Sequence, residues 1–304
     1  MQCVCHPAVA ILPEPLAQTM PMTRHDAAWH DKQYNNRARV ADHERFLSRW
    51  PQASALARSE LAGSLDIAFG DMPGERLDVF AAAKPGAPVL VFIHGGYWRS
   101  LDKSDFSFVA PIFVQAGATV VVPSYDLCPA VSIETIAMQC ARALAWVWRN
   151  VALRGGDPSR IVVVGHSAGG HLAALLLACR WKLVGDDLPL RLVAGAMAIS
   201  GLYDLEPLRH TPFLQADLKL TPTQVRRLSP AYFARPRGPL FAVVGGDESD
   251  EFIRQNRLIR DQWGPSSVPV CETVTGRHHF DIVNDLVDPA CRTHARALQL
   301  LGLA

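Results

Sequence analysis

The stretch VVVGHSAGGHLA, residues 162–173, constrains the fold most, because it joins two apolar elements through a very short turn. The apolar run predicts a strand that ends at Gly165, and the Ala- and Leu-rich residues after it predict a helix that begins near Ala168. Ser167 then lies on a turn so sharp that its dihedrals are strained. The glycines at 165 and 169 relieve the crowding around it.

This turn makes the Ser167 hydroxyl a candidate nucleophile. The hydroxyl would be held above the carboxyl ends of the strands, beside a helix N-terminus whose free N–H groups favour a developing negative charge. The pattern G-x-S-x-G is common by chance, but a strand before it and an apolar helix after it make it specific. The alternative interpretation is a serine that only caps the helix.

Apolar runs and amphipathic stretches alternate along the rest of the chain. We expect strands at residues 65–69, 76–82, 88–94, 118–126, 160–165, 192–200, 239–245 and 268–274, and helices at 105–116, 132–151, 168–179, 251–263 and 280–302. Such alternation predicts an α/β fold with a mostly parallel central sheet and helices on both faces. Residues 1–22 are expected to be a disordered tail and residues 23–304 a single domain. The irregular, proline-containing segment 203–236 is expected to be a small cap-like insertion.

The composition argues against several classes of partner. The chain has 304 residues, and its 30 Lys and Arg against 29 Asp and Glu give a formal net charge of +1 without a basic block, so nucleic acid is not an expected partner. No apolar run reaches the roughly 18 residues of a membrane helix, so no membrane partner is expected. Seven irregularly spaced cysteines favour a reducing, cytoplasmic location over a disulfide framework. A homodimer is compatible with this composition.

The N-terminal tail has two features of its own. It lacks the positively charged start of a secretory signal, and Met20 or Met22 could be the true start of the protein. Cys3, Cys5 and His6 resemble half of a metal site. No second half follows nearby, so no metal is predicted.

A serine nucleophile needs a base, and the loop after the strand at 268–274 offers two histidines. His279 is preferred because it lies three residues past Gly276 and directly before an apolar helix start. His278 is then a neighbour in the loop.

The base needs an acid that orients it, and the loop after the strand at 239–245 offers three. Glu248 is preferred because it lies three residues past Gly245, the usual spacing for a turn that delivers the acid. Asp247 and Asp250 remain alternatives. The order serine, acid, histidine is the one expected for this kind of fold, and parallel strands bring all three to one edge of the sheet.

Attack on a carbonyl also needs N–H donors that already point at the developing oxyanion. The Ala168 N–H, directly after the candidate nucleophile, is one donor. The loop after the strand at 88–94 supplies the other, because its glycines let the backbone of Gly96 and Tyr97 approach a substrate closely. His94 is expected to brace this loop rather than to act as a second base.

These motifs together carry a family resemblance. HGG followed by an aromatic pair, GHSAGGHLA and HHFDIV resemble the α/β-hydrolase superfamily. With SYDLCP and ESDEF added, the chain resembles more narrowly the arylformamidase (kynurenine formamidase) family of serine hydrolases. Tyr97 stands where related carboxylesterases more often have a third glycine, which favours the formamidase side.

The resemblance implies hydrolysis of N-formylkynurenine to kynurenine and formate in tryptophan degradation. The reaction would pass through a formyl-enzyme on Ser167 and require no metal or organic cofactor. The family's acid falls on Glu248, although some relatives carry aspartate there. Two alternatives are a general carboxylesterase or deacetylase for short-chain esters, and a non-enzymatic binding module. The module would be favoured by loss of the serine, histidine or acid, and all three are present.

An aromatic formamide or ester, as a small-molecule partner, would need aromatic walls around the site. Tyr97 and Trp98 are expected to line the substrate pocket, because they follow the oxyanion loop directly. Four further aromatic residues are candidates: Tyr34, Trp50, Tyr203 and Phe213.

Overall fold

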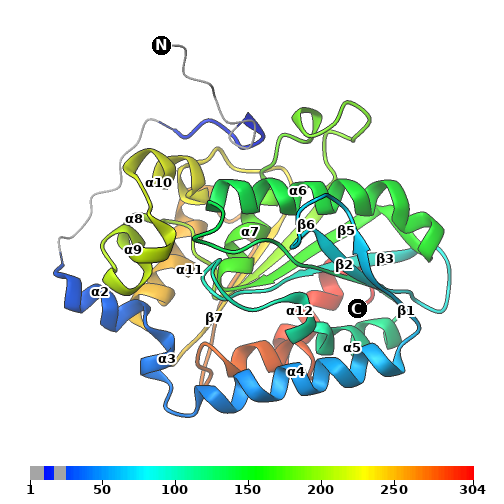
Figure 1. Cartoon of the computed structure of the whole chain (residues 1–304), viewed down its shortest axis with the longest axis horizontal. Helices are drawn as coiled ribbons and strands as arrows, with labels where there is room; N and C mark the ends of the chain where they lie inside the picture. The colour runs from blue at the N-terminus through cyan, green and yellow to red at the C-terminus, as the bar shows by residue number, and fades with distance from the viewer. Residues whose placement is uncertain (1–9, 17–24) are drawn as a thin grey trace.

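The central feature of the computed structural model, which describes residues 10–16 and 25–304, is an eight-stranded sheet (Figure 1). Its strands are β1 (Gly63–Ala68), β2 (Arg76–Phe80), β3 (Ala87–Ile93), β4 (Thr119–Pro123), β5 (Gly156–His166), β6 (Val193–Ile199), β7 (Leu240–Gly245) and β8 (Val270–Val274). They lie in the order β1-β2-β4-β3-β5-β6-β7-β8. Strand β2 is antiparallel to both of its neighbours, and every other pair is parallel. The predicted α/β fold with a mostly parallel sheet is confirmed.

Helices cover both faces of the sheet (Figure 1). The α-helices are α2 (Ala27–Tyr34), α3 (Asn36–Arg39), α4 (His43–Glu60), α5 (Ala110–Gln115), α6 (Ile133–Asn150), α7 (Ala168–Leu177), α8 (Glu206–Arg209), α9 (Pro212–Leu218), α10 (Pro222–Leu228), α11 (Asp250–Trp263) and α12 (Arg292–Leu301). Short 3-10 turns are η1 (Lys103–Asp105), η2 (Ser107–Val109), η3 (Val151–Arg154), η4 (Trp181–Leu183), η5 (Pro230–Tyr232) and η6 (Asp281–Leu286).

Two apolar cores lie on the two sides of the sheet. Strand β3 is buried along its whole length, and its side chains alternate between the cores. Val89 and Val91 pack on one side with residues of α6, α7 and α11, whereas Leu90 and Phe92 pack on the other with residues of α4, α5 and α12. The centre of the sheet, where β3, β5 and β6 lie side by side, is therefore packed on both faces.

The predicted disordered tail at residues 1–22 is wrong for its described part. Ile11 and Leu12 are buried in the core, and the Ile11 carbonyl accepts a hydrogen bond from the Arg180 N–H at 2.7 Å. Two apolar side chains with a place to pack hold this piece of chain on the domain. The half metal site at Cys3, Cys5 and His6, and the two start methionines considered at positions 20 and 22, lie outside the described residues.

The predicted helix at 280–302 is also wrong, because the chain breaks it in two. Residues Asp281–Leu286 form a 3-10 turn and Arg292–Leu301 form α12, with Pro289 between them. Proline lacks a backbone donor and disfavours helical geometry in the residue before it. Helices α2 to α4 were not anticipated from the sequence at all.

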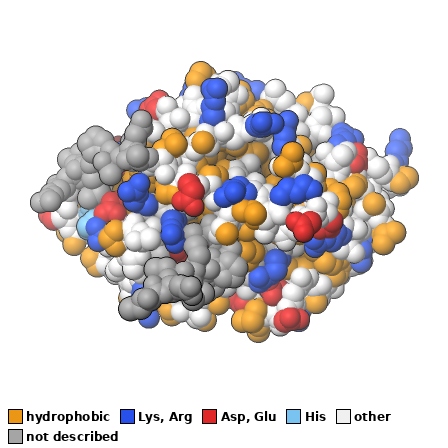
Figure 2. Space-filling view, turned by 90° about the horizontal axis from the view of Figure 1, so that it is seen from above, with side chains coloured by type: hydrophobic (Ala, Val, Ile, Leu, Met, Phe, Trp, Pro, Cys, Tyr) orange, Lys and Arg blue, Asp and Glu red, His pale blue; other side chains and the backbone are white. Residues whose placement is uncertain are grey.

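The segment at 203–236 folds into the short helices α8, α9 and α10; α8 and α9 lie beside α2, and α10 lies near α6 (Figure 1). Within the described ranges, no helix is long and apolar enough to cross a membrane. Basic and acidic side chains are interspersed with apolar ones on the face seen in Figure 2.

Candidate active site

The candidate nucleophile lies on a strained turn between β5 and α7. Ser167 has φ 57° and ψ −117°, and α7 begins at the next residue. A Cβ atom at position 169 would lie 2.0 Å from the Ile93 carbonyl oxygen, so only glycine fits there. The sharp turn predicted from the sequence is therefore present. Strain of this kind is held in place by the surrounding packing and is typical of functional sites.

His279 lies beside this serine. Its Nε2 is 3.1 Å from Ser167 Oγ, and its Nδ1 is 2.6 Å from Glu248 Oε2. The carboxylate can only accept, so Nδ1 carries the proton and donates it to Glu248. Nε2 is then free to accept the proton of the serine hydroxyl. Serine, histidine and glutamate thus form one hydrogen-bonded line.

Both carboxylate oxygens of Glu248 accept hydrogen bonds. Its Oε1 accepts hydrogen bonds from the Ser200 hydroxyl and, at 2.8 Å, from the Gly245 N–H. The carboxylate is buried, whereas the alternatives Asp247 and Asp250 are exposed, and the ion pair of His279 is made with Glu248. Among the three acids weighed from the sequence, the structure brings only Glu248 to His279.

The neighbouring histidine has a local role. His278 Nδ1 accepts hydrogen bonds from the N–H groups of Phe280 at 3.1 Å and Asp281 at 3.2 Å, so it caps the following turn. His279 is buried against the Phe252 ring, whose centroid lies 4.7 Å from its own. The structure thus places His279, not His278, against the serine.

The glycine loop after β3 lies directly against the serine. A Cβ atom at Gly95 would come within 3.2 Å of Ser167 Cβ. Gly96 and Tyr97 have positive φ angles of 97° and 51°, which turn the loop back at this point. The Ala168 N–H is the first of α7 and has no partner within the helix. Gly96 and Tyr97 line the same cavity as Ser167, and the use of their N–H groups and that of Ala168 as oxyanion donors stays a prediction.

His94 braces this loop from below. Its ring stacks on Tyr125 with centroids 4.2 Å apart, and its Nδ1 donates to the Gly95 carbonyl at 2.9 Å. Burial lowers the pKa of His94 to about 4, so the ring is neutral near pH 7. Its Nε2 has no partner in the part of the chain that is described. These contacts fit the predicted bracing role of His94.

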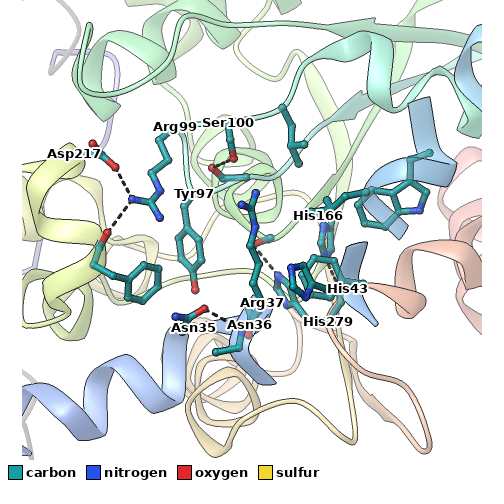
Figure 3. Close-up of a pocket in the computed structure, with 18 residues that line it drawn as sticks. Asn35, Asn36, Arg37, His43, Tyr97, Arg99, Ser100, His166, Asp217 and His279 are labelled. Carbon is teal, nitrogen blue, oxygen red and sulfur yellow. Dashed lines mark hydrogen bonds and ion pairs between the residues drawn. The ribbon is translucent and has the colours of Figure 1, made fainter. Parts of the chain in front are cut away.

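A cavity of about 600 Å³ opens over Ser167 and His279 (Figure 3). Tyr97 lines it, as predicted, together with Trp50 and Phe213. These aromatic rings give the cavity a partly apolar wall, suited to an aromatic group.

The prediction that Trp98 lines the pocket is wrong. Trp98 is fully buried and packs edge-on against His171, with ring centroids 4.9 Å apart. Its positive φ of 56° turns the side chain into the core, away from the cavity. Tyr34 and Tyr203, two further candidates, are also buried and do not line the cavity.

Two polar contacts tie the glycine loop to the elements that cover it. The Tyr97 hydroxyl donates to the Tyr34 carbonyl at 2.7 Å, at the end of α2. The Arg99 guanidinium pairs with Asp217 and donates to the Phe213 carbonyl at 2.8 Å, both on α9 (Figure 3). The cap segment and the N-terminal helices are thereby held over the serine.

Sequence reasoning missed several groups at the site. Ser200 donates a hydrogen bond to Glu248 and has a positive φ of 53° directly after β6. Its position at the carboxyl edge of the sheet was the one feature of the sequence that could have pointed to it. Asn35, Asn36 and Arg37 line the cavity but belong to a segment without any motif. No group of three or more candidate metal ligands occurs among the residues described.

Comparison with known proteins agrees with this arrangement. A family model described as the alpha/beta hydrolase fold matches residues 90–254. A kynurenine formamidase from Danio rerio is 31% identical over 265 residues, which cover 84% of this chain and 88% of the relative. An esterase from Mycobacterium tuberculosis is 29% identical over 289 residues, covering 84% of this chain and 66% of that protein.

A solved structure is similar over almost the same range. The crystal structure of a provisionally assigned thioesterase from Silicibacter sp. superposes with a TM-score of 0.77 at 29% identity, covering 87% of this chain and 97% of that one. The extent of these matches, together with the sheet order and the serine turn, settles the family. The chain belongs to the alpha/beta hydrolase family, within which it is a relative of the kynurenine formamidases.

Proposed function

We propose that this protein is an arylformamidase that hydrolyses N-formylkynurenine to kynurenine and formate through a formyl-enzyme on Ser167. The observation that carries the proposal is the line Ser167–His279–Glu248, which opens into an aromatic-walled cavity. The similarity to kynurenine formamidases over most of the chain supports the choice of substrate.

In the first half of the reaction, Ser167 Oγ attacks the formyl carbon while its proton moves to His279 Nε2. The negative oxygen of the tetrahedral intermediate accepts hydrogen bonds from the Ala168 N–H and from the Gly96 and Tyr97 N–H groups. His279 then gives its proton to the aryl nitrogen, the carbon–nitrogen bond breaks, and the aryl amine leaves.

In the second half, water attacks the formyl ester on Ser167. His279 takes a proton from this water, the ester bond breaks, and the proton returns to Ser167 Oγ as formate leaves. Glu248 accepts the hydrogen bond from His279 Nδ1 and stabilises the imidazolium that forms twice in each cycle. Ser200 and the Gly245 N–H act as positioning groups for that carboxylate.

A general carboxylesterase is the second candidate, and the similarity to an esterase of Mycobacterium tuberculosis favours it. The same machinery would then act on an ester carbonyl, so the two functions differ in what the cavity binds rather than in the catalytic groups.

Turnover of N-formyl-L-kynurenine and p-nitrophenyl acetate, measured side by side, separates the two candidates. We expect kcat/KM for the formamide to exceed that for the ester by at least about 10-fold, which is roughly 1.4 kcal/mol of preferential transition-state binding. Ester hydrolysis with negligible formamide cleavage would assign the chain to the carboxylesterases.

A further inference from the structure

One charged side chain that lines the cavity has no role in the reaction just described. Arg37, on the four-residue helix α3, lines the same cavity as Ser167 and His279. Figure 3 shows its side chain extending from α3 across the cavity, toward the side on which Ser100 lies. Arg37 is exposed, and within residues 10–16 and 25–304 its guanidinium has no ion-pair or hydrogen-bond partner.

The charges that line the cavity do not balance. Arg99 is neutralised by Asp217 and is further fixed by the Phe213 carbonyl. Arg37 is left as the excess charge, since the remaining lining residues are apolar, amide, hydroxyl or histidine side chains. A guanidinium keeps its proton at any physiological pH, so the cavity carries a permanent positive charge.

The backbone that carries Arg37 is held close to the reactive loop. The Asn35 side chain caps α3 by accepting a hydrogen bond from the Ala38 N–H at 3.1 Å. One residue earlier, the Tyr34 carbonyl accepts the hydrogen bond from the Tyr97 hydroxyl. Arg37 therefore starts from a position fixed relative to the oxyanion loop, as a group that orients a substrate must be.

The side-chain amide nitrogen of Asn36 is a second polar group beside the cavity that lacks a partner in the described part of the chain. Asn36 lines the cavity, is 5% exposed, and its Nδ2 has no acceptor among the described residues. A buried amide without a partner is costly, and a bound polar group is one way to satisfy it. The positive charge and the unpaired amide occur at adjacent positions on the same short helix.

We propose that Arg37 binds the carboxylate of the substrate and so selects formamides whose aryl amine leaving group carries an amino-acid carboxylate. Arginine recognises carboxylates through two parallel N–H···O bonds, which fix orientation as well as adding affinity. This inference rests on the proposed function, because N-formylkynurenine carries such a carboxylate whereas a simple aryl ester does not. Arg37 is a binding residue here and takes no part in proton transfer.

The test compares Arg37→Ala with Arg39→Ala, because both arginines are exposed on the same helix but only Arg37 lines the cavity. The substrates are N-formyl-L-kynurenine and N-formyl-2-aminoacetophenone, an aryl formamide without a carboxylate. For Arg37→Ala we expect KM for the first substrate to rise by about 10- to 100-fold, with kcat nearly unchanged. KM for the second substrate should not change, and Arg39→Ala should behave as wild type with both.

An equal loss with both formamides would overturn the proposal, because Arg37 would then only shape the cavity. Unchanged KM values would overturn it as well. Inhibition of p-nitrophenyl acetate hydrolysis by L-kynurenine and by 2-aminoacetophenone tests Arg37 without relying on formamide cleavage. A weaker inhibition constant for kynurenine alone in Arg37→Ala supports carboxylate binding even in an enzyme that cleaves only esters, and equal constants contradict it.

Discussion

At the scale of single residues, the buried carboxylate of Glu248 is hydrogen-bonded through both of its oxygens. One carboxylate oxygen accepts from His279, and the other accepts from Ser200 and from the Gly245 N–H. These hydrogen bonds hold the carboxylate in place, and the carboxylate in turn keeps the histidine in one tautomer and one orientation. The charge therefore acts on the base, and through it on the serine.

Replacing this acid tests the assignment against its closest alternative. Glu248→Gln keeps the shape but removes the charge, and we expect kcat to fall by about 10²- to 10⁴-fold. Asp247→Asn is the matched control and should stay within about 2-fold of wild type, because Asp247 is exposed. A large loss in Asp247→Asn with little loss in Glu248→Gln would reverse the assignment of the acid.

The residues of the hydrogen-bonded line were predictable because their signals are local. Ser167 lies in a five-residue pattern, and His279 and Glu248 each lie three residues past a glycine at or just beyond the end of a strand. Trp98 was misplaced because its side-chain direction depends on a backbone φ of 56°, which spacing does not reveal.

At the scale of elements, the turn between β5 and α7 depends on close packing against β3. A Cβ at position 169 would lie 2.0 Å from the Ile93 carbonyl oxygen and 2.6 Å from that of His94. The strand ends and the helix start are thus in van der Waals contact through backbone atoms alone. This contact fixes the serine relative to the oxyanion loop.

Two glycine-to-alanine substitutions distinguish the steric effect of this contact from the strain of a positive φ angle. Gly169→Ala should lower the free energy of unfolding by about 3 kcal/mol, because backbone atoms must move to admit the methyl group. Gly86→Ala is the control: its φ is +72° but nothing lies within 4 Å, so we expect a loss of roughly 1 kcal/mol. Urea denaturation measures both. Equal losses would mean that the turn is not tightly packed.

The elements around the cavity were harder to foresee than those under it. Strands β3 and β7 are buried, mostly apolar runs, and the second half of β5 carries the apolar run 161–164. The loops at their ends, where the sequence predicted the chemistry, meet at the candidate site. Helix α3 is four residues long and polar, and it reaches the cavity only through the packing of its neighbours. No periodicity in the sequence encodes that approach.

At the scale of the whole molecule, the N-terminal part of the chain belongs to the domain and to the site. Residues 10–16 add Ile11 and Leu12 to the core, while α2, α3 and α4 follow the gap at 17–24. Helices α3 and α4 contribute one wall of the cavity and α9 contributes another. The loops at the strand ends supply the reacting groups, and these helices supply the walls of the cavity.

The contribution of the first described segment can be measured directly. Ile11 is 1% exposed, so Ile11→Ala should lower the free energy of unfolding by about 2 to 5 kcal/mol. Leu16 is 46% exposed, and Leu16→Ala should change it by no more than about 0.5 kcal/mol. Thermal or urea unfolding of the full chain checks both values. A neutral Ile11→Ala would mean that this segment does not add to the core.

The central claim is that Ser167 carries the formyl group during hydrolysis of an aryl formamide. The most direct measurement is kcat/KM for N-formyl-L-kynurenine in wild type and in Ser167→Ala, with the unfolding midpoint of each recorded. We expect turnover in the wild type and a loss of at least about 10³-fold in the variant, with little change in the midpoint. Turnover retained in folded Ser167→Ala would contradict the account.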